Sequence, residues 1–270
     1  VHTVHILAFV GVSAWKRVFY KKVEQLLSSI TSSYIFVSEG LRKEFISSVP
    51  GAGSRLNAVV LSGMEVERFT RVREGRSGKE LNSVVGRTAK LVAIGMIEDR
   101  KRMRELVQSM ISLSRFHPNL SWELRIAGEG SLLAELQAKV EASGLSEQVM
   151  FSGYVENVAV FLAEADLLIH ASHVEGLPRV VIQALASGVP VVCHALPGIK
   201  ETLSHAHNVW VVEEVSDAAF VSAIAQVLGD QELLSRLRGA AMEFDARPWS
   251  SEYMVEGISE VYERVLSTEA

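Results

Sequence analysis

The sequence predicts an α/β protein built on parallel strands. Apolar runs of strand length alternate with amphipathic runs of helix length along the whole chain, which is the pattern of strands joined by helical crossovers. The chain has 270 residues, of which 48% are hydrophobic and 22% are charged. This composition is typical of a globular protein, and the length is enough for one large domain or two modest ones.

The expected strands and helices follow one another in close alternation. The apolar runs predict strands at 4–10, 34–38, 57–61, 90–95, 122–127, 148–152, 166–170, 189–193 and 208–212. The amphipathic runs predict helices at 15–30, 39–48, 101–116, 131–143, 156–164, 178–187, 199–204, 216–228, 231–245 and 251–267. Residues 70–88 are rich in Gly, Ser and charge, so we expect a linker or long loop there.

Composition excludes several classes of protein. The net charge of −5 provides no basic field for nucleic acid over the whole surface. The single cysteine, Cys193, excludes an internal disulfide or a thiolate zinc cluster and is interpreted as a small buried hydrophobe. No apolar run approaches the ~18 residues of a membrane helix, and the first residues lack the basic flank of a signal peptide. We therefore expect a cytoplasmic protein.

The stretch from His170 to Thr202 holds the clearest candidate site. Its pattern predicts a strand, a sharp loop, a helix and a strand, with Glu175 just before the helix and Gln183 eight positions later. Pro178 suits the first helical turn, and free N–H groups at such a helix start bind anions. A continuous helix would separate residues 175 and 183 by about 12 Å, roughly the span of a sugar, a diphosphate and a ribose. A sugar-nucleotide site is therefore our hypothesis.

A second candidate loop, residues 95–106, also follows a strand and opens a helix. Arg100, Lys101, Arg102 and Arg104 place four cations at that helix start. Cations there oppose the helix dipole, whereas a bound phosphate would balance both. A solvated charged turn is the alternative, and the sequence leaves the two open.

Cofactor and metal sites are not expected. The glycines of residues 127–136 begin like a dinucleotide-binding loop, but Leu133 stands where the third glycine is required, so the glycines are assigned to a tight turn. His205 and His207 lack a third metal ligand at a recognisable spacing. For His5, within an expected strand, burial with hydrogen-bond partners is favoured over a position facing an interdomain cleft.

Other enzyme classes lack their motifs. The sequence has neither the Gly-x-Ser-x-Gly elbow of serine hydrolases nor the phosphate-binding loop of P-loop NTPases. A glycosidase needs paired acids, and Glu175 faces the amide Gln183 across the gap.

Several blocks of the chain also match a known family in their order. These blocks are TVH at 3–5, VSEGLRKEF at 37–45, VVLSGMEVERF at 59–69, GMIEDRK at 95–101, LRIAGEGSLLAEL at 124–136, the segment 149–192 and PGIKET at 197–202. Together they resemble the retaining glycosyltransferases of GT-B fold, the large family four. The resemblance implies two Rossmann-like domains across a cleft. Residues 1–69 would be the remainder of an acceptor-side N-terminal domain, residues 89–248 a nucleotide-sugar-binding domain, and residues 249–270 a helix that packs back toward the N-terminal domain.

The resemblance implies a role for each matching residue. Glu175 matches the first glutamate of a Glu, seven residues, Glu motif and would contact the donor sugar near the reacting centre. Lys101 matches the lysine that holds the donor diphosphate, where its charge would stabilise the leaving group. His5 matches the histidine that faces the donor across the cleft. The other matches are Gly176, Leu177 and Pro178 beside the sugar and diphosphate, and Tyr154 and Val155 beside the nucleobase.

Three positions depart from the family pattern. Gln183 replaces the second glutamate, which accepts hydrogen bonds from the ribose, and losing the charge weakens such a contact by roughly 1–2 kcal/mol. Met96 replaces an arginine that pairs with the lysine on the diphosphate. Ser62-Gly63 replaces the usual Asn-Gly. Relatives also carry about a hundred more residues before the position of His5. Together with the first part of this chain, that length would make a full domain. We therefore expect an incomplete N-terminal domain, and a fragment, a partner-completed protein and a degenerate product remain open.

The resemblance implies an enzyme, a hexosyltransferase that moves a sugar from a nucleoside-diphosphate donor to a saccharide or lipid-linked acceptor with retention, in polysaccharide or glycolipid synthesis. A donor-binding or partner-binding module without catalysis is the alternative that Met96 and Gln183 favour, and a GT-B nucleotide-sugar epimerase is a weaker one. The expected partners are the donor and the acceptor, without nucleic acid, metal or other cofactor. Peripheral contact with the inner face of the membrane and association through the incomplete N-terminal domain are further options.

Overall fold

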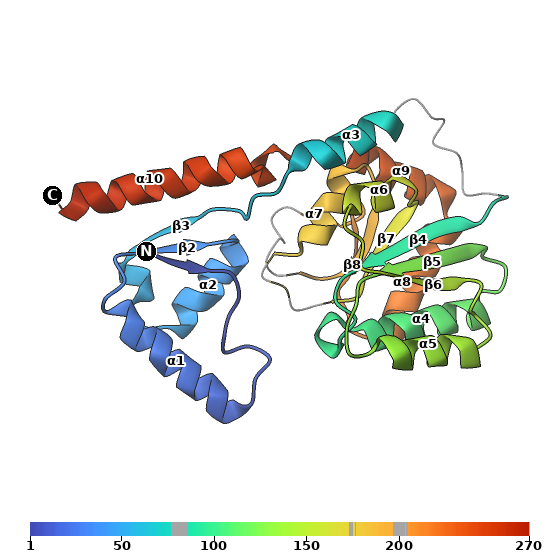
Figure 1. The fold of residues 1–270 in the computed structure, drawn as a ribbon, viewed down its shortest axis with the longest axis horizontal. Helices are drawn as coiled ribbons and strands as arrows, with labels where there is room; N and C mark the ends of the chain where they lie inside the picture. The colour runs from blue at the N-terminus through green and yellow to red at the C-terminus, as the bar shows by residue number, and fades with distance from the viewer. Residues whose placement is uncertain (77–85, 173–174, 176, 197–202, 204, 270) are drawn as a thin grey trace.

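The chain forms two parallel sheets (Figure 1). The computed structural model describes residues 1–76, 86–172, 175, 177–196, 203 and 205–269. The smaller sheet has the order β1-β2-β3, with strands His2–Val4, Ser33–Phe36 and Leu56–Val59. The larger sheet has six strands in the order β6-β5-β4-β7-β8-β9. Both sheets are built from parallel pairs, which confirms the predicted α/β class.

The larger sheet is a complete doubly wound, Rossmann-like sheet. Its strands are β4 (Ala89–Ile94), β5 (Trp122–Ala127), β6 (Val149–Gly153), β7 (Leu167–His170), β8 (Val191–His194) and β9 (Trp210–Val212). The chain adds β5 and β6 on one side of β4 and then returns to add β7, β8 and β9 on the other. The strand order therefore reverses between β4 and β7.

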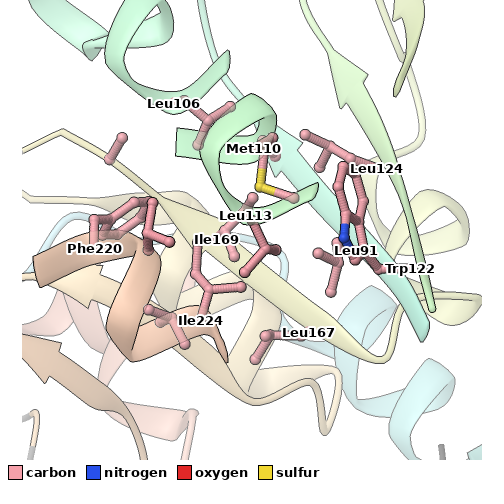
Figure 2. Close-up of a cluster of buried hydrophobic side chains, with 14 of the residues drawn as sticks. Leu91, Leu106, Met110, Leu113, Trp122, Leu124, Leu167, Ile169, Phe220 and Ile224 are labelled. Atoms are coloured by element: carbon pink, nitrogen blue, oxygen red, sulfur yellow. The ribbon is translucent and has the colours of Figure 1, made fainter. Parts of the chain in front are cut away.

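Helices cover both faces of the larger sheet. They are α4 (Met103–Phe116), α5 (Leu133–Ala142), α6 (Val158–Ala163), α7 (Arg179–Ala186), α8 (Asp217–Gly229) and α9 (Gln231–Met242). Successive residues of a strand point to opposite faces, so Leu91 of β4 enters one core and Val92 enters the other. Figure 2 shows the first core, where Met110 of α4 and Phe220 of α8 lie over the strands.

The smaller sheet packs against helices from opposite ends of the chain. These helices are α1 (Ala14–Ser28), α2 (Glu39–Ser48) and α10 (Ser251–Glu269). Phe36 of β2 points to one face, where its ring lies 5.4 Å from that of Phe45 in α2. Ile35 points to the other face, where Val261 of α10 packs. The last helix of the chain therefore lies along the first sheet (Figure 1).

Helix α3 (Val66–Arg76) joins the two sheets and was not predicted. The expectation of a linker or loop from residue 70 was therefore wrong for residues 70–76, and residues 77–85 lie outside the described part of the chain. Arg73 Nη1 donates to the carbonyl oxygen of Phe244 at 2.6 Å. Arg76 donates to the carbonyl oxygens of Leu162, Ala163 and Ala165 at the end of α6, at 3.3, 2.9 and 2.8 Å. These long-range bonds hold the helix against the larger sheet.

Two further expectations differ from the structure. Strand β1 ends at Val4 rather than at residue 10, because its pairing with β2 ends where Val4 lies opposite Phe36. Apart from residue 203, the helix expected at 199–204 lies outside the described residues. The other expected strands and helices are present, with ends shifted by a few residues.

Candidate active site

The reversal of strand order between β4 and β7 places a crevice at the carboxyl ends of these two strands. Open parallel sheets bind their ligands at such a switch point, because the loops after the two strands lead to opposite faces of the sheet. Lys101 lies in the loop after β4, within the short 3₁₀ turn Asp99–Lys101, and Glu175 lies in the loop after β7. The topology thus brings together two residues that the sequence identified separately.

Lys101 and Glu175 form a largely buried ion pair. Lys101 Nζ donates to Glu175 Oε1 at 2.6 Å, and the two side chains are 19% and 8% exposed. A charge-assisted hydrogen bond of this length, with little access for water, is among the strong interactions in a protein. The pair joins residues that are 74 positions apart.

Glu175 is ionised at neutral pH. Burial raises the pKa of its carboxyl, but the hydrogen bond and charge of Lys101, with further contributions from His170 and Ser172, outweigh burial and hold the pKa below its ordinary value. Glu175 is therefore an acceptor of hydrogen bonds. An acid that protonates a leaving group would instead need a raised pKa.

His170 is a site residue that the sequence analysis did not identify. It ends β7, its side chain is 7% exposed, and its Nε2 lies 3.7 Å from Glu175 Oε1. Burial lowers the pKa of His170 to about 4, and the opposing effect of Glu175 is partly offset by Lys101 and His194. The imidazole is therefore neutral at neutral pH. The available signal was a histidine at the end of an apolar run, five residues before Glu175.

The cations at the start of α4 divide into one site residue and three arginines that pair with neighbouring acids. Lys101 contacts Glu175, whereas the three arginines pair with acids of their own surroundings. These pairs are Arg100 with Glu98 at 3.1 Å, Arg102 with Glu105 and Asp217 at 3.7 Å each, and Arg104 with Asp99 at 2.8 Å and with Glu135. The charged-turn interpretation therefore accounts for Arg100 and Arg104, whereas the Arg102 side chain is only 15% exposed. The phosphate-binding interpretation remains for Lys101.

The loop after β4 rests on the loop after β5. Ile97 N donates to the carbonyl oxygen of Glu129 at 2.8 Å. A Cβ atom at Gly128 would lie 1.9 Å from Gly95 O, and one at Gly130 would lie 2.3 Å from Ile97 O. The two glycines therefore permit backbone-to-backbone packing of the two loops, which is a reason beyond the tight turn that the sequence suggested.

The remaining expected donor-binding residues lie in loops after strands of the larger sheet, and so at its carboxyl edge. Met96 is 54% exposed and Tyr154 is 74% exposed, whereas Val155 is half-buried. At the start of α7, Leu177 is half-buried and Pro178 is buried, while Gly176 lies outside the described residues.

Gln183 borders a hollow of about 350 Å³ that it shares with Arg179. The same hollow is lined by Gly63 from the segment between the sheets and by Glu156 from the loop after β6, and Arg179 Nη2 donates to Gly63 O at 3.3 Å. Helix α7 begins only at Arg179, so the span from Glu175 to Gln183 is not helical throughout. The spacing of about 12 Å, which assumed a continuous helix, therefore does not apply.

The amino edge of the larger sheet holds a cluster with a structural role. Asp166, just before β7, accepts hydrogen bonds from Arg87 at 2.6 and 2.7 Å, from Arg238 at 3.2 Å and from the backbone N–H of Lys90 at 2.9 Å. A hollow of about 540 Å³ lies beside Arg87 at this edge. It is at the opposite end of the strands from the Lys101–Glu175 pair.

His5 is exposed and follows β1, so the favoured interpretation of a buried histidine is wrong. Within the described residues, no hydrogen bond or ion pair joins His5 to Lys101 or Glu175. Leu177 packs both against the core of the larger sheet and against the cluster of the smaller sheet that contains Val4.

Two kinds of feature are absent from the described residues. None of the helices there is long and apolar enough to cross a bilayer. No group of three His, Cys, Asp or Glu side chains in the same part of the chain is placed to hold a metal ion.

Known proteins match the chain in sequence. The family described as Glycosyl transferases group 1 matches residues 81–244. The N-acetyl-alpha-D-glucosaminyl L-malate synthase of Bacillus anthracis is 26% identical, over 65% of this chain and 45% of its own length. The GDP-mannose-dependent alpha-(1-6)-phosphatidylinositol monomannoside mannosyltransferase of Mycolicibacterium smegmatis is 28% identical, over 80% of this chain and 56% of its own length. The chain thus spans about half the length of these curated relatives.

A solved structure shows the same fold. HepE of Anabaena, in complex with UDP-glucose, superposes with a TM-score of 0.75 over 97% of this chain and 71% of that one. The two sequences are 16% identical, so this likeness concerns the fold alone.

Proposed function

The chain belongs to the group 1 glycosyl transferases, and from this premise we propose that it moves a hexose from a nucleoside-diphosphate donor to a saccharide or lipid-linked acceptor. The observation that carries the proposal is the ion pair of Lys101 and Glu175 at the switch point. It provides a cation for a diphosphate and a carboxylate for sugar hydroxyls at the place where open parallel sheets bind ligands.

Lys101 binds the diphosphate in this proposal. Its charge stabilises the negative charge that develops on the leaving group as the bond between sugar and phosphate breaks. The side chain is only 19% exposed, and electrostatic interactions are stronger where water is excluded. Glu175 accepts hydrogen bonds from the sugar hydroxyls and orients the ring. The sugar is transferred with retention, and His5 faces it from the side of the smaller sheet, as the family resemblance implies.

The hollow beside Gln183 is the proposed place of the nucleoside. The amide of Gln183 can accept one hydrogen bond from the ribose hydroxyls and donate another. HepE of Anabaena binds UDP-glucose, and the mycobacterial relative is named as GDP-mannose-dependent. Uridine and guanosine are therefore the two nucleosides to test first.

The acceptor is proposed from the relatives' names. One relative is named as an N-acetyl-alpha-D-glucosaminyl L-malate synthase and the other as a phosphatidylinositol monomannoside mannosyltransferase, so small and lipid-linked hydroxyl compounds both occur in their names. We place the protein in polysaccharide or glycolipid synthesis on this basis. The cytoplasmic location and the peripheral membrane contact stay predictions.

A donor-binding module without catalysis is the second candidate. Met96 supports it, because an exposed apolar side chain stands where the family pattern has an arginine for the diphosphate. Gln183 supports it as well, because an amide lacks the charge of the carboxylate that it replaces.

Isothermal titration with UDP, GDP, UDP-glucose and GDP-mannose tests donor binding. We expect one nucleoside series to bind, and Lys101→Ala and Glu175→Ala each to weaken sugar-nucleotide binding by about tenfold or more. Lys22→Ala in α1 and Glu147→Ala before β6 are matched controls, because both side chains are exposed and remote from the switch point. If none of the four compounds binds the unaltered chain, the donor proposal fails.

Turnover separates the enzyme from the module. The sugar nucleotide that binds in the titration is incubated with this chain and, separately, with the longest form of the protein that its gene encodes. The nucleoside diphosphate that is released is then measured. Release that depends on Glu175 supports the transferase. Tight binding without release in either form supports the module. The double variant Met96→Arg, Gln183→Glu should tighten binding about tenfold if both side chains face the donor.

A further inference from the structure

Besides Lys101, Glu175 has a hydrogen-bond donor nearby that is not in use. Lys101 Nζ donates to Oε1 at 2.6 Å. His170 Nε2 lies 3.7 Å from the same oxygen, which is too long for a hydrogen bond. Within the described residues this buried nitrogen has no hydrogen-bond partner. A buried polar atom without a partner is uncommon and calls for a reason.

The two tasks of Lys101 compete with each other. In the structure its ammonium group neutralises Glu175, but a bound diphosphate would draw the same group toward the phosphate oxygens. Glu175 is 8% exposed, so water cannot readily replace the lysine. A buried carboxylate that loses its partner must find another, move toward solvent or take up a proton. Movement toward solvent or uptake of a proton would remove the charged carboxylate from the sugar.

We propose that His170 is a positioning residue that takes over the carboxylate of Glu175 when Lys101 turns to the diphosphate, with Nε2–H donating to Oε1. This proposal rests on the proposed function, since it is the donor that engages Lys101. The handover keeps Glu175 aimed at the sugar throughout donor binding.

The surroundings of His170 suit this role. The residue ends an interior strand, where β7 pairs with β8 and His170 lies opposite Cys193, so its backbone is held in place. The distance of 3.7 Å must shorten by less than about 1 Å to reach hydrogen-bond length. While Lys101 is on Glu175 the imidazole is neutral, because burial lowers the pKa of His170 to about 4, and a neutral imidazole carries one N–H that can donate to a carboxylate.

NMR of the histidine ring N–H protons in the ligand-free Lys101→Met variant tests the handover without a nucleotide. Removal of the lysine should bring His170 Nε2–H onto Glu175, which gives a slowly exchanging, downfield ring proton that the unaltered chain lacks. The double variant Lys101→Met, Glu175→Ala should lose this signal, because the acceptor is gone. A Lys101→Met spectrum without the signal would overturn the proposal. Lys101→Ala, which also leaves no donor at this position, serves as the second variant if Lys101→Met does not fold.

Nucleotide binding provides the second arm. His170→Leu should leave the affinity for the free nucleoside diphosphate (UDP or GDP) within about twofold but weaken the matching sugar nucleotide about tenfold, because only the sugar depends on Glu175. His170→Gln places an amide N–H near the position of Nε2 and should restore most of the loss, which a purely structural role of His170 would not produce. Equal losses for both compounds, or no rescue, would contradict the handover.

The two proposals fail in distinguishable ways. If no nucleotide binds the unaltered chain but the ring proton appears in Lys101→Met, the donor function fails and the handover geometry is supported. If nucleotides bind in a Lys101-dependent manner and the ring proton never appears, the donor function is supported and the handover is overturned.

Discussion

Lys101 Nζ and Glu175 Oε1 lie 2.6 Å apart, although the two residues belong to loops that follow different strands, β4 and β7. The parallel pairing of β4 with β7 places the two loops at the same edge of the sheet. Helical crossovers lead away from both strands to opposite faces, so the space between the loops is left for a ligand. The ion pair is thus a product of strand order as much as of side-chain chemistry.

Replacing Lys101 should destabilise the fold as well as weaken binding. We expect Lys101→Met to lower the free energy of unfolding by about 1–3 kcal/mol, because the largely buried Glu175 loses its strongest partner. Arg100→Met in the same turn is the control, since Arg100 is 49% exposed and its pair with Glu98 should contribute less than about 0.5 kcal/mol. Urea unfolding at neutral pH measures both. Equal stabilities of the two variants would contradict the importance of the buried pair.

His170 should make the stability of the protein depend on pH. Burial lowers its pKa from 6.5 to about 4, so between these values the unfolded chain binds a proton that the folded chain does not. The contribution of the neutral imidazole is complete above pH 6.5 and is lost as the pH falls toward 4, by about 2 kcal/mol at about pH 5.

His170→Gln should therefore flatten the fall in unfolding free energy between about pH 7.5 and about pH 5. His207→Gln, at an exposed position, should keep the slope of the unaltered chain. The carboxyls of Glu175 and Asp166 titrate below this pH range, because the pKa values of both are lowered. A slope that is unchanged in His170→Gln would show that another group causes the dependence.

Asp166 should matter for stability and not for ligand binding. Burial raises the pKa of its carboxyl, but hydrogen bonds from Arg87 and from the backbone of Lys90 outweigh burial and lower it. Asp166→Asn leaves the arginines without their carboxylate, and we expect a loss of about 3 kcal/mol in unfolding free energy. Nucleotide affinity should stay the same, because the cluster lies at the amino edge of the sheet. The surface variant Asp245→Asn should cost less than about 0.5 kcal/mol.

Gly128 should be irreplaceable for a steric reason. A Cβ atom there would lie 1.9 Å from Gly95 O, and φ is +142°, so Gly128→Ala must push apart the two loops at the site. We expect a loss of about 3 kcal/mol or more, measured by thermal or urea unfolding. Gly239→Ala is the control, because that glycine lies within α9 with open space around it, and alanine there should add about 0.5–1 kcal/mol. Similar stabilities of both variants would refute the close packing of the loops.

The sequence was a good guide to elements and to single site residues. Strands such as β5 and β8 are recognisable from local apolar runs, because side-chain periodicity alone indicates which residues are buried. Glu175 and Lys101 were identified because each stands in a loop between a strand and a helix. Helix α3 was not predicted, because its sequence is charged and contains a glycine. Hydrogen bonds from Arg73 and Arg76 to carbonyl oxygens of residues 244 and 162–165 stabilise it instead.

The sequence by itself determined the α/β class, the alternation of strands and helices, and the residue types available for a diphosphate and a sugar. Only the tertiary structure decided that Lys101 pairs with Glu175, that His170 lies beside Glu175, that His5 is exposed, and that Gly128 and Gly130 allow two site loops to pack backbone to backbone. The physical reason is the range of the interactions. Periodicity and turn chemistry act over a few neighbouring residues, whereas strand order, burial and pKa depend on contacts between segments that are distant in the chain.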